Sequence, residues 1–297
     1  ATSEEEVLEG VADADAILLY HLISLTKKSI SRLEKCRLIV RAGVGYDNVD
    51  WKLARERGID VCNVPDYGTE DVADSAIGLM LSLTRGIHFH NSRLRRGLGQ
   101  WGYSEYPAVS RLRGRTFGII GLGRIGTAAA LRAKALGMKV VFYDPYARDG
   151  MDKAVGAQRA ETMAELFAQT HVLSPHCPLT SETRHIVNAD TIARLPKGSY
   201  VVNTARGGVV DVEAILDAVT SGQLAGAGID VLETEPPSGE EPFIQAWRDP
   251  EHPAHDRIIV NPHTAFYCEE GLGEMRMKAV HNVARVLRGE APRNLVN

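Results

Sequence analysis

The sequence has 297 residues, of which 44% are hydrophobic and 24% are charged. A chain of this length forms one large domain or two ordinary ones, and its composition argues against intrinsic disorder. The 38 acidic residues outnumber the 34 basic ones, and the resulting net charge of −4 argues against general binding to nucleic acid. No apolar run approaches the ~20 residues that a membrane-spanning helix needs, so we expect no association with membranes.

The four cysteines, Cys36, Cys62, Cys177 and Cys268, are far apart in the sequence. Their scatter argues against a disulfide framework. Zinc sites usually have closely spaced ligands, so we also expect no bound metal. Four reduced thiols are typical of a cytoplasmic protein, which is the location that the sequence favours.

The first block of the chain alternates short apolar runs with helical segments. Strands are predicted at residues 16–19, 37–41 and 59–63, and helices at residues 3–11 and 50–57. The first of these helices has no strand before it. We therefore expect a further strand, with part of its loop, to precede residue 1 in the natural protein, and an intact-mass measurement would test this.

A long helix is predicted at residues 69–96, where it would bridge the first block and the second. Thr69 can cap its first turn, and Glu70 and Asp71 suit the positive end of the helix dipole. The apolar residues that recur at helical spacing are Ala73, Ala76, Ile77, Met80, Leu83 and Ile87.

The second block, from about residue 114, continues the alternation. Its predicted strands lie at residues 117–121, 139–143, 171–174, 200–203, 226–231 and 257–260. Its predicted helices lie at residues 124–136, 162–169, 212–221 and 271–288. Regular alternation of this kind predicts βαβ units, and hence an α/β fold with parallel sheets.

The strongest local motif is the glycine-rich turn Gly121-Leu-Gly-Arg-Ile-Gly126, between a predicted strand and a predicted helix. Gly121 allows the tight turn, Gly123 lets a pyrophosphate approach the backbone, and Gly126 lets the helix pack closely. The next strand is followed by Asp144, whose carboxylate would accept hydrogen bonds from a ribose. Because that charge would repel a 2′-phosphate, the sequence favours NAD over NADP.

Polar residues also follow the later predicted strands. Arg206 lies beyond the strand at residues 200–203, and Asp230 closes the next strand. Glu235 lies a few residues further on, and His263 follows the last strand. Ligands of open α/β sheets bind at the carboxyl ends of the strands, so we expect these side chains to lie together. Taken singly, Arg206 could form a surface ion pair, Glu235 could be a solvated loop residue and His263 could be a cap.

Five stretches that span nearly the whole chain carry a resemblance to a known family. They are Arg41-Ala-Gly-Val-Gly-Tyr-Asp-Asn-Val-Asp50, Gly118-Ile-Ile-Gly-Leu-Gly-Arg-Ile-Gly126, Val202-Asn-Thr-Ala-Arg-Gly-Gly208, Gly228-Ile-Asp-Val231 with Glu235-Pro236, and Pro262-His263. The sequence resembles the D-isomer-specific 2-hydroxyacid dehydrogenase family. Cys62-Asn-Val-Pro65, Leu131-Arg-Ala-Lys-Ala135 and Phe142-Tyr-Asp-Pro-Tyr146 most resemble its C-terminal-binding protein branch, which includes transcriptional corepressors that bind NAD(H).

The resemblance implies a catalytic set of three residues. His263 matches the histidine that exchanges a proton with the substrate oxygen, and Glu235 matches the acid that holds this histidine. A carboxylate partner favours the imidazolium form. Arg206 matches the arginine that binds the substrate carboxylate, a task that suits a planar guanidinium.

The resemblance also implies residues that bind substrate and cofactor. The backbone amides of Val44 and Gly45 match a loop that holds the substrate carboxylate. Phe266 stands where the corepressors have a tryptophan, so it would keep an aromatic wall without the indole N–H, although it could equally be a core residue. The positions that match the cofactor site are Gly121, Gly123, Arg124, Ile125, Gly126, Asp144, Pro178, Thr204, Ala205, Arg206, Asp230 and His263.

The fold that the resemblance implies has two doubly wound parallel-sheet domains. A Rossmann NAD-binding domain at residues 86–265 would be inserted in a flavodoxin-like substrate domain made of residues 1–85 and 266–297. Family members are usually dimers, so we expect a homodimer in which the helix after Thr69 packs against its counterpart.

The function that the resemblance implies is NAD-dependent interconversion of a small D-2-hydroxy acid and its 2-keto acid. The motifs do not distinguish among glyoxylate, hydroxypyruvate, pyruvate and bulkier keto acids. The alternative is an NAD(H)-sensing corepressor, similar to the C-terminal-binding proteins, whose main task is to bind partner peptides.

Overall fold

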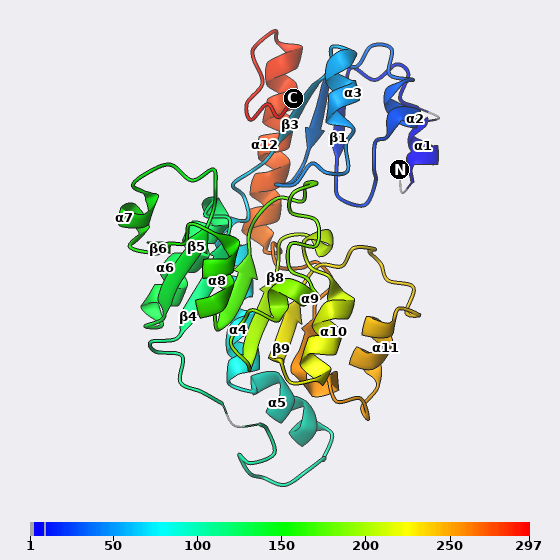
Figure 1. The fold of residues 1–297 in the computed structure, drawn as a ribbon. Helices are drawn as coiled ribbons and strands as arrows, with labels where there is room; N and C mark the ends of the chain where they lie inside the picture. Colours follow the sequence, from blue (N-terminus) through cyan, green and yellow to red (C-terminus); the bar gives the residue numbers. More distant parts are fainter. Residues whose placement is uncertain (1–2, 9, 108) are drawn as a thin grey trace. The chain divides into compact units, whose positions relative to one another are not determined.

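The computed structural model describes residues 3–8, 10–107 and 109–297, which form two compact units (Figure 1). One unit combines Ala1–Thr69 with Tyr267–Asn297, and the other is the continuous segment Glu70–Phe266. The sequence-based division grouped residues 70–85 with the two ends of the chain. In the structure these residues belong to the continuous unit, because Ala76 and Met80 are buried in its core.

The continuous unit is built on one seven-stranded sheet. Its strands are β4 (Thr116–Ile120), β5 (Lys139–Tyr143), β6 (Gln158–Arg159), β7 (Val172–Pro175), β8 (Ser199–Asn203), β9 (Leu224–Ile229) and β10 (Ile258–Val260). They are all parallel and lie in the order β10-β9-β8-β7-β4-β5-β6. The chain adds β5 and β6 on one side of β4 and then returns to add β7 on the other. The sheet is therefore doubly wound, and the predicted α/β Rossmann-type fold is confirmed.

Helices pack against both faces of this sheet. The longer ones are α4 (Thr69–Thr84), α6 (Arg124–Ala135), α8 (Met163–Gln169), α10 (Val212–Thr220) and α11 (Pro242–Arg248). The segments of this unit that the sequence analysis did not predict are β6, α7 (Met151–Val155), α9 (Ala189–Ile192), α11 and the 3₁₀ turns η1 (Gly207–Val209) and η2 (His255–Arg257). Most are too short to show a helical period, which is why pattern analysis missed them.

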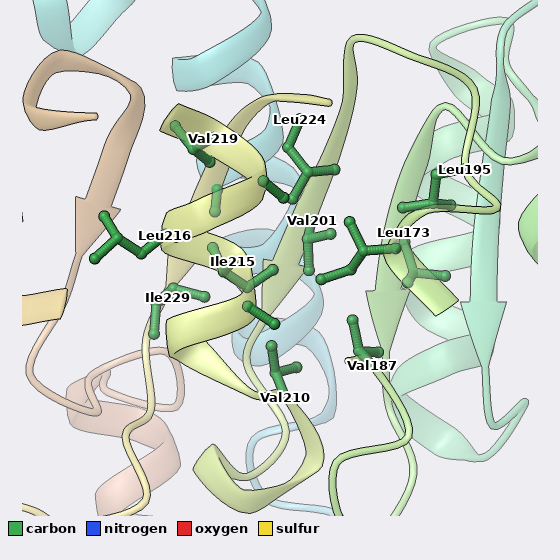
Figure 2. Packing of buried hydrophobic residues seen from close by; sticks show 14 of the residues in the cluster. Leu173, Val187, Leu195, Val201, Val210, Ile215, Leu216, Val219, Leu224 and Ile229 are labelled. Atoms are coloured by element: carbon green, nitrogen blue, oxygen red, sulfur yellow. The ribbon is translucent and has the colours of Figure 1, made fainter. Parts of the chain in front are cut away.

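Two buried clusters fill the space between the helices and the sheet. Val201 and Val202 are neighbours on β8 and belong to different clusters, because alternate side chains of a strand point to opposite faces. Figure 2 shows one cluster, in which Ile215 of α10 lies near Val201 and Leu173 lies on the neighbouring strand. The other cluster contains the apolar stripe of α4.

The predicted long helix at residues 69–96 is wrong in one respect, because it is two helices, α4 and α5 (Ile87–Arg95). They are separated at Gly86, whose φ of 63° lies in the left-handed region where an α-helix ends. A Cβ on Gly86 would lie 2.7 Å from Cδ1 of Tyr106, and the Tyr106 hydroxyl donates a hydrogen bond to the carbonyl of Leu83 at 3.0 Å. Tyr106 therefore fills the corner between the helices.

The smaller unit joins the two ends of the chain. Its parallel sheet has the order β1 (Ala16–Leu19), β2 (Leu38–Arg41), β3 (Asp60–Asn63). Its helices are α1 (Glu4–Leu8), α2 (Lys27–Ile30), α3 (Trp51–Glu56) and α12 (Glu269–Leu287). The amide of Val296 donates to the carbonyl of Val61 at 2.8 Å, so the C-terminal residues lie beside β3. The first helix ends at Leu8, earlier than predicted, and residue 9 within the predicted range lies outside the described residues.

Three further features of the described residues concern membrane-spanning helices, metal ligands and thiols. No helix among them has the length and apolar character that crossing a bilayer requires. Within residues 3–8, 10–107 and 109–297, no group of three or more potential ligand side chains could hold a metal ion. All four cysteines are free thiols, and Cys36 and Cys62 are buried.

Candidate active site

The glycine-rich turn follows β4, at the point where the strand order reverses. Gly121 has a φ of 90°, and a Cβ there would lie 3.1 Å from backbone atoms of His176 and Cys177. A Cβ on Gly126 would lie 2.2 Å from the carbonyl oxygen of Gly121. A Cβ on Gly123, in contrast, would meet nothing within 4 Å. Two of the glycines therefore permit close packing, and the third leaves space at the start of α6.

Asp144, at the end of β5, holds this turn in place. Its Oδ2 accepts a hydrogen bond from the amide of Leu122 at 2.8 Å, and its Oδ1 accepts one from the amide of Tyr146 at 2.9 Å. The Tyr146 hydroxyl donates to Oε2 of Glu182 at 2.9 Å, and this bond raises the pKa of Tyr146. Glu182 is thus a second carboxylate linked to this part of the site, and the sequence analysis did not single it out.

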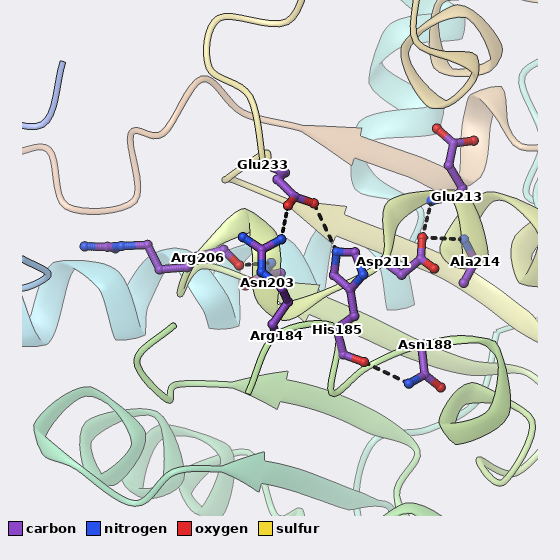
Figure 3. A network of polar contacts seen from close by, with 9 residues as sticks. All are labelled: Arg184, His185, Asn188, Asn203, Arg206, Asp211, Glu213, Ala214 and Glu233. Carbon is purple, nitrogen blue, oxygen red and sulfur yellow. Dashed lines mark hydrogen bonds and ion pairs between the residues drawn. The ribbon is translucent and has the colours of Figure 1, made fainter. Parts of the chain in front are cut away.

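The segment after β8 carries Arg206. Buried Asn203 shapes it, because its Oδ1 accepts from the amide of Ala205 at 3.0 Å and its Nδ2 donates to the carbonyl of Arg206 at 2.9 Å. A Cβ on Gly207 would lie 2.0 Å from the carbonyl carbon of Leu232, so only glycine lets the two backbones approach this closely. The half-buried Arg206 side chain extends from this segment in Figure 3.

Asp230, at the end of β9, holds the segment after β10. Its two carboxylate oxygens accept hydrogen bonds from the amides of Thr264 and Ala265, each at 3.0 Å. Burial raises the pKa of Asp230, and these two hydrogen bonds oppose that effect. The Asp230 carbonyl also accepts from the amide of His263 at 2.8 Å, which helps to hold His263 at a φ of 52°, uncommon for a residue other than glycine.

His263 and Glu235 are in direct contact. Nδ1 of His263 lies 2.7 Å from Oε2 of Glu235, and Oε1 of Glu235 accepts from the amide of Leu232 at 2.8 Å. Burial raises the pKa of Glu235, but the contact with His263, the Leu232 amide and the charge of Arg206 outweigh it and leave the pKa below its ordinary value. The ring of Phe266 stands edge-on to the imidazole, with 6.0 Å between the ring centroids.

The structure therefore places Glu235 against His263, with the charge of Arg206 close enough to affect the Glu235 carboxylate. Val44 and Gly45 belong to the other unit, in the segment after β2, where Asn63 Nδ2 donates to the Val44 carbonyl at 2.7 Å. Their role as substrate-binding residues stays a prediction.

The site fits a dinucleotide. Gly123 caps α6 without a side-chain hydrogen bond, so the first amides of the helix can donate to phosphate oxygens. Thr204 Oγ1 is buried and has no hydrogen-bond partner among the described residues. Arg124 and Ile125 are the first residues of α6, Pro178 is exposed beyond β7, and Ala205 follows Thr204.

Two residues beside the turn were not among the predicted site residues. His176 and Cys177 follow β7 directly, and their backbone packs against Gly121. Burial lowers the pKa of His176 to about 4, and its Nε2 lies 3.0 Å from Oγ of Ser174. The only sequence signal for His176 and Cys177 is their position directly after β7, the strand that lies beside β4 where the strand order reverses.

Comparisons with known proteins identify the family to which this chain is similar. The family model for the NAD binding domain of D-isomer specific 2-hydroxyacid dehydrogenases matches residues 77–265. D-3-phosphoglycerate dehydrogenase of Methanocaldococcus jannaschii is 36% identical over 295 residues, which are 99% of this chain and 54% of that protein. C-terminal-binding protein 1 of Caenorhabditis elegans is 36% identical over 304 residues, which are 100% of this chain and 41% of that protein. The chain thus spans about half the length of these curated relatives.

One solved structure of a relative matches over most of both chains. D-lactate dehydrogenase from Aquifex aeolicus, complexed with NAD and lactic acid, is 29% identical with a TM-score of 0.84. The match covers 97% of this chain and 86% of that one.

The doubly wound sheet and the glycine-rich turn at its reversal define a dinucleotide-binding α/β protein. The family match covers more than half of the chain, so the chain belongs to the D-isomer specific 2-hydroxyacid dehydrogenase family, with an NAD-binding domain at residues 77–265. The resemblance found in the sequence is confirmed, including the likeness to a C-terminal-binding protein.

Proposed function

We propose that this protein is an NAD-dependent oxidoreductase that interconverts a small D-2-hydroxy acid and its 2-keto acid. The observation that carries the proposal is the 2.7 Å contact between Glu235 and His263, on segments that follow neighbouring strands of the dinucleotide-binding sheet. An imidazole held by a carboxylate is suited to general acid–base catalysis. Membership of the family supports this class of reaction.

Each of the three proposed catalytic residues has one task. His263 donates a proton from Nε2 to the keto oxygen during reduction, because Nδ1 faces Glu235. The ionised Glu235 orients the ring through Nδ1 of His263. Arg206 binds the substrate carboxylate through two parallel hydrogen bonds, which fixes the keto group beside His263.

When bound, NADH would supply the hydride that C2 of the keto acid receives. The proton from His263 then completes the hydroxyl group, so the keto acid gains one hydride and one proton. In the reverse direction His263 takes the hydroxyl proton back. Asp144 favours NAD over NADP, because its carboxylate would accept from a ribose and repel a 2′-phosphate.

The proposed substrates are small 2-keto and 2-hydroxy acids. Phe266 would supply an aromatic wall beside His263, and the amides of Val44 and Gly45 would hold the substrate carboxylate. Glyoxylate, hydroxypyruvate, pyruvate and bulkier keto acids belong in one test panel, because a single apolar change in a pocket shifts selectivity by only ~1–3 kcal/mol.

The test follows NADH absorbance while a panel of 2-keto acids is added. We expect rapid oxidation with at least one acid, and a loss of about 10²–10⁴-fold in His263→Ala. Arg206→Ala should raise the KM for the keto acid and leave the Kd for NADH, measured by fluorescence, nearly unchanged. Unchanged turnover in His263→Ala, or an unchanged KM for the keto acid in Arg206→Ala, would exclude the proposed site.

A second candidate function is NAD(H)-dependent binding of partner peptides. The 36% identity to C-terminal-binding protein 1 favours it, since the dehydrogenase relative is no more similar. Pull-downs with short linear peptides, with and without NADH, test this function. Tight NADH binding without turnover, together with cofactor-dependent peptide binding, would replace the first proposal by the second.

We also propose that the chain forms a homodimer through α5 and the segment that follows it. Trp101 and Tyr103, in the segment after α5, are 91% and 92% exposed. The ion pair between Arg93 of α5 and Glu105 at 3.0 Å ties this segment to the helix. The other exposed apolar residues here are Ile87, Leu94, Leu98 and Val109. Apolar side chains gathered on one exposed segment are typical of an interface. The cytoplasmic location stays a prediction from cysteine usage.

A further inference from the structure

Two carboxylates lie two positions apart on the loop after β9, and they have different partners. Glu235 contacts His263, whereas Glu233 contacts Arg184 and His185 in the segment after β7 (Figure 3). One oxygen of Glu233 pairs with Nη1 of Arg184, and the other lies 3.0 Å from Nε2 of His185. The hydrogen bond from Arg184, followed by that from His185, lowers the pKa of Glu233, so this carboxylate is charged at neutral pH.

The segment of Arg184 and His185 is also tied to the segment that carries Arg206. The amide of His185 donates to the carbonyl of Gly208 at 2.8 Å, and Nδ2 of Asn188 donates to the carbonyl of His185 at 2.8 Å. These bonds hold His185 at a φ of 48°, which is uncommon outside glycine. A Cβ on Gly208 would lie 3.7 Å from Cζ of Arg184, so the guanidinium packs against this segment.

The loop after β9 touches the Arg206 segment directly. A Cβ on Gly207 would lie 2.0 Å from the carbonyl carbon of Leu232 and 2.2 Å from the amide nitrogen of Glu233. The Leu232 amide in turn donates to Oε1 of Glu235 at 2.8 Å. A shift of residues 232–235 would therefore move both the segment that carries Arg206 and the carboxylate that holds His263.

We propose that Glu233 is a positioning residue, which through Arg184 and His185 holds the Arg206 segment in register with the Glu235–His263 pair. This inference rests on the proposed function, in which Arg206 binds the substrate and His263 exchanges its proton. Glu233 itself acts only through the residues that it holds.

The proposed effect is on geometry rather than on overall stability. The side chains of Arg184, His185 and Glu233 are 53%, 40% and 46% exposed, and exposed ion pairs contribute little to folding. Arg206, which binds the carboxylate, and His263, which donates the proton, must act on one substrate molecule. A displacement of about 1 Å of one relative to the other can therefore reduce the rate about 10²-fold.

The test compares Glu233→Gln, which keeps the side-chain size but removes the charge, with Asp74→Asn as a matched control. Asp74 is an exposed carboxylate of the same unit that pairs with Arg132. In Glu233→Gln we expect the KM for the keto acid to rise about tenfold and the Kd for NADH to change less than about twofold. Asp74→Asn should change neither value. An unchanged KM in Glu233→Gln, or an equal loss of NADH affinity, would overturn the inference.

A double-mutant comparison tests whether Glu233 acts through Arg184. Arg184→Ala should raise the KM as Glu233→Gln does, and the combined variant should be no worse than the more impaired single variant, because both changes remove the same contact. Arg184→Lys keeps a cation beside Glu233 and should recover part of the loss. Fully additive effects would contradict the proposed contact.

Hydrogen–deuterium exchange separates this inference from the proposed function. Amides of residues 204–208 and 232–235 should exchange faster in Glu233→Gln and at the normal rate in Asp74→Asn. If the unmodified protein reduced no 2-keto acid, the proposed function would fail, whereas faster exchange would still support the link between the two loops. Unchanged exchange would refute that link.

Discussion

Glycines at the site serve two different purposes. Backbone atoms occupy the space beside Gly126 and Gly207 where a Cβ would stand, whereas nothing lies within 4 Å of that position at Gly123. The first two glycines are needed for packing, and we propose that the third is needed for the approach of the cofactor. A substitution at Gly123 therefore separates cofactor binding from folding.

Gly123→Ala is expected to fold normally and to bind NADH at least about tenfold more weakly, because the added methyl group would stand where the pyrophosphate approaches the backbone. Thermal unfolding and NADH fluorescence measure the two effects. Gly273→Ala on α12 is the control, since it adds a methyl group that also meets nothing within 4 Å. NADH affinity equal to that of the unmodified protein would show that the phosphates bind elsewhere.

The Glu235–His263 contact predicts how stability depends on pH. The pKa of Glu235 is lower in the folded protein than its ordinary value of 4.5, so its contribution to stability is present above that value. The contribution is lost as the pH falls through the lowered pKa. The difference in unfolding free energy between the unmodified protein and Glu235→Gln should therefore shrink in acid. Urea unfolding at a series of pH values measures it, and a difference independent of pH would contradict the prediction.

At the scale of elements, the order of the strands explains why residues far apart in the sequence share a site. Arg206, Asp230 and His263 follow β8, β9 and β10, which are neighbours in the sheet. The amide of Asp230 donates a hydrogen bond to the carbonyl of Asn203 at 2.9 Å. The amide of Asn261 donates one to the carbonyl of Ile229, also at 2.9 Å. These bonds continue the ladder beyond the strands and bring the polar segments side by side.

The corner between α4 and α5 gives a prediction about a single element. Gly86→Ala should destabilise the protein by about 1–3 kcal/mol, because φ is positive there and the added Cβ would clash with Tyr106. Gly78→Ala on α4 should instead stabilise it by about 0.5–1 kcal/mol, because its Cβ would meet nothing within 4 Å and alanine favours a helix. Urea unfolding measures both. Equal changes in the free energy of unfolding in Gly86→Ala and Gly78→Ala would argue against a clash with Tyr106 at the corner between α4 and α5.

At the scale of the whole molecule, the proposed dimer depends on two aromatic side chains. Replacing both Trp101 and Tyr103 by alanine should convert the dimer to a monomer, because these are the most exposed large apolar residues of the described chain. Analytical ultracentrifugation of the full chain gives the mass of each species. Met277→Ala on α12 removes another exposed apolar side chain and should leave the mass unchanged. A double variant that remains dimeric would place the interface elsewhere.

The sequence by itself determined the α/β class, most of the strands and the dinucleotide turn. These features depend on local patterns: the alternation of strands and helices, and glycines at Gly121, Gly123 and Gly126 between a strand and a helix. A pattern within a few residues is enough, because each of these features is decided by the backbone conformation of adjacent residues.

Only the tertiary structure decided how the pieces of the site are held. Tyr106 fills the corner at Gly86, and Glu233 reaches Arg184, 49 positions earlier in the chain. Such contacts join residues that are distant in sequence, so no local pattern records them. The contact between Glu233 and Arg184 exists because the doubly wound sheet brings the ends of separate strands to one edge, where the side chains that follow those strands meet.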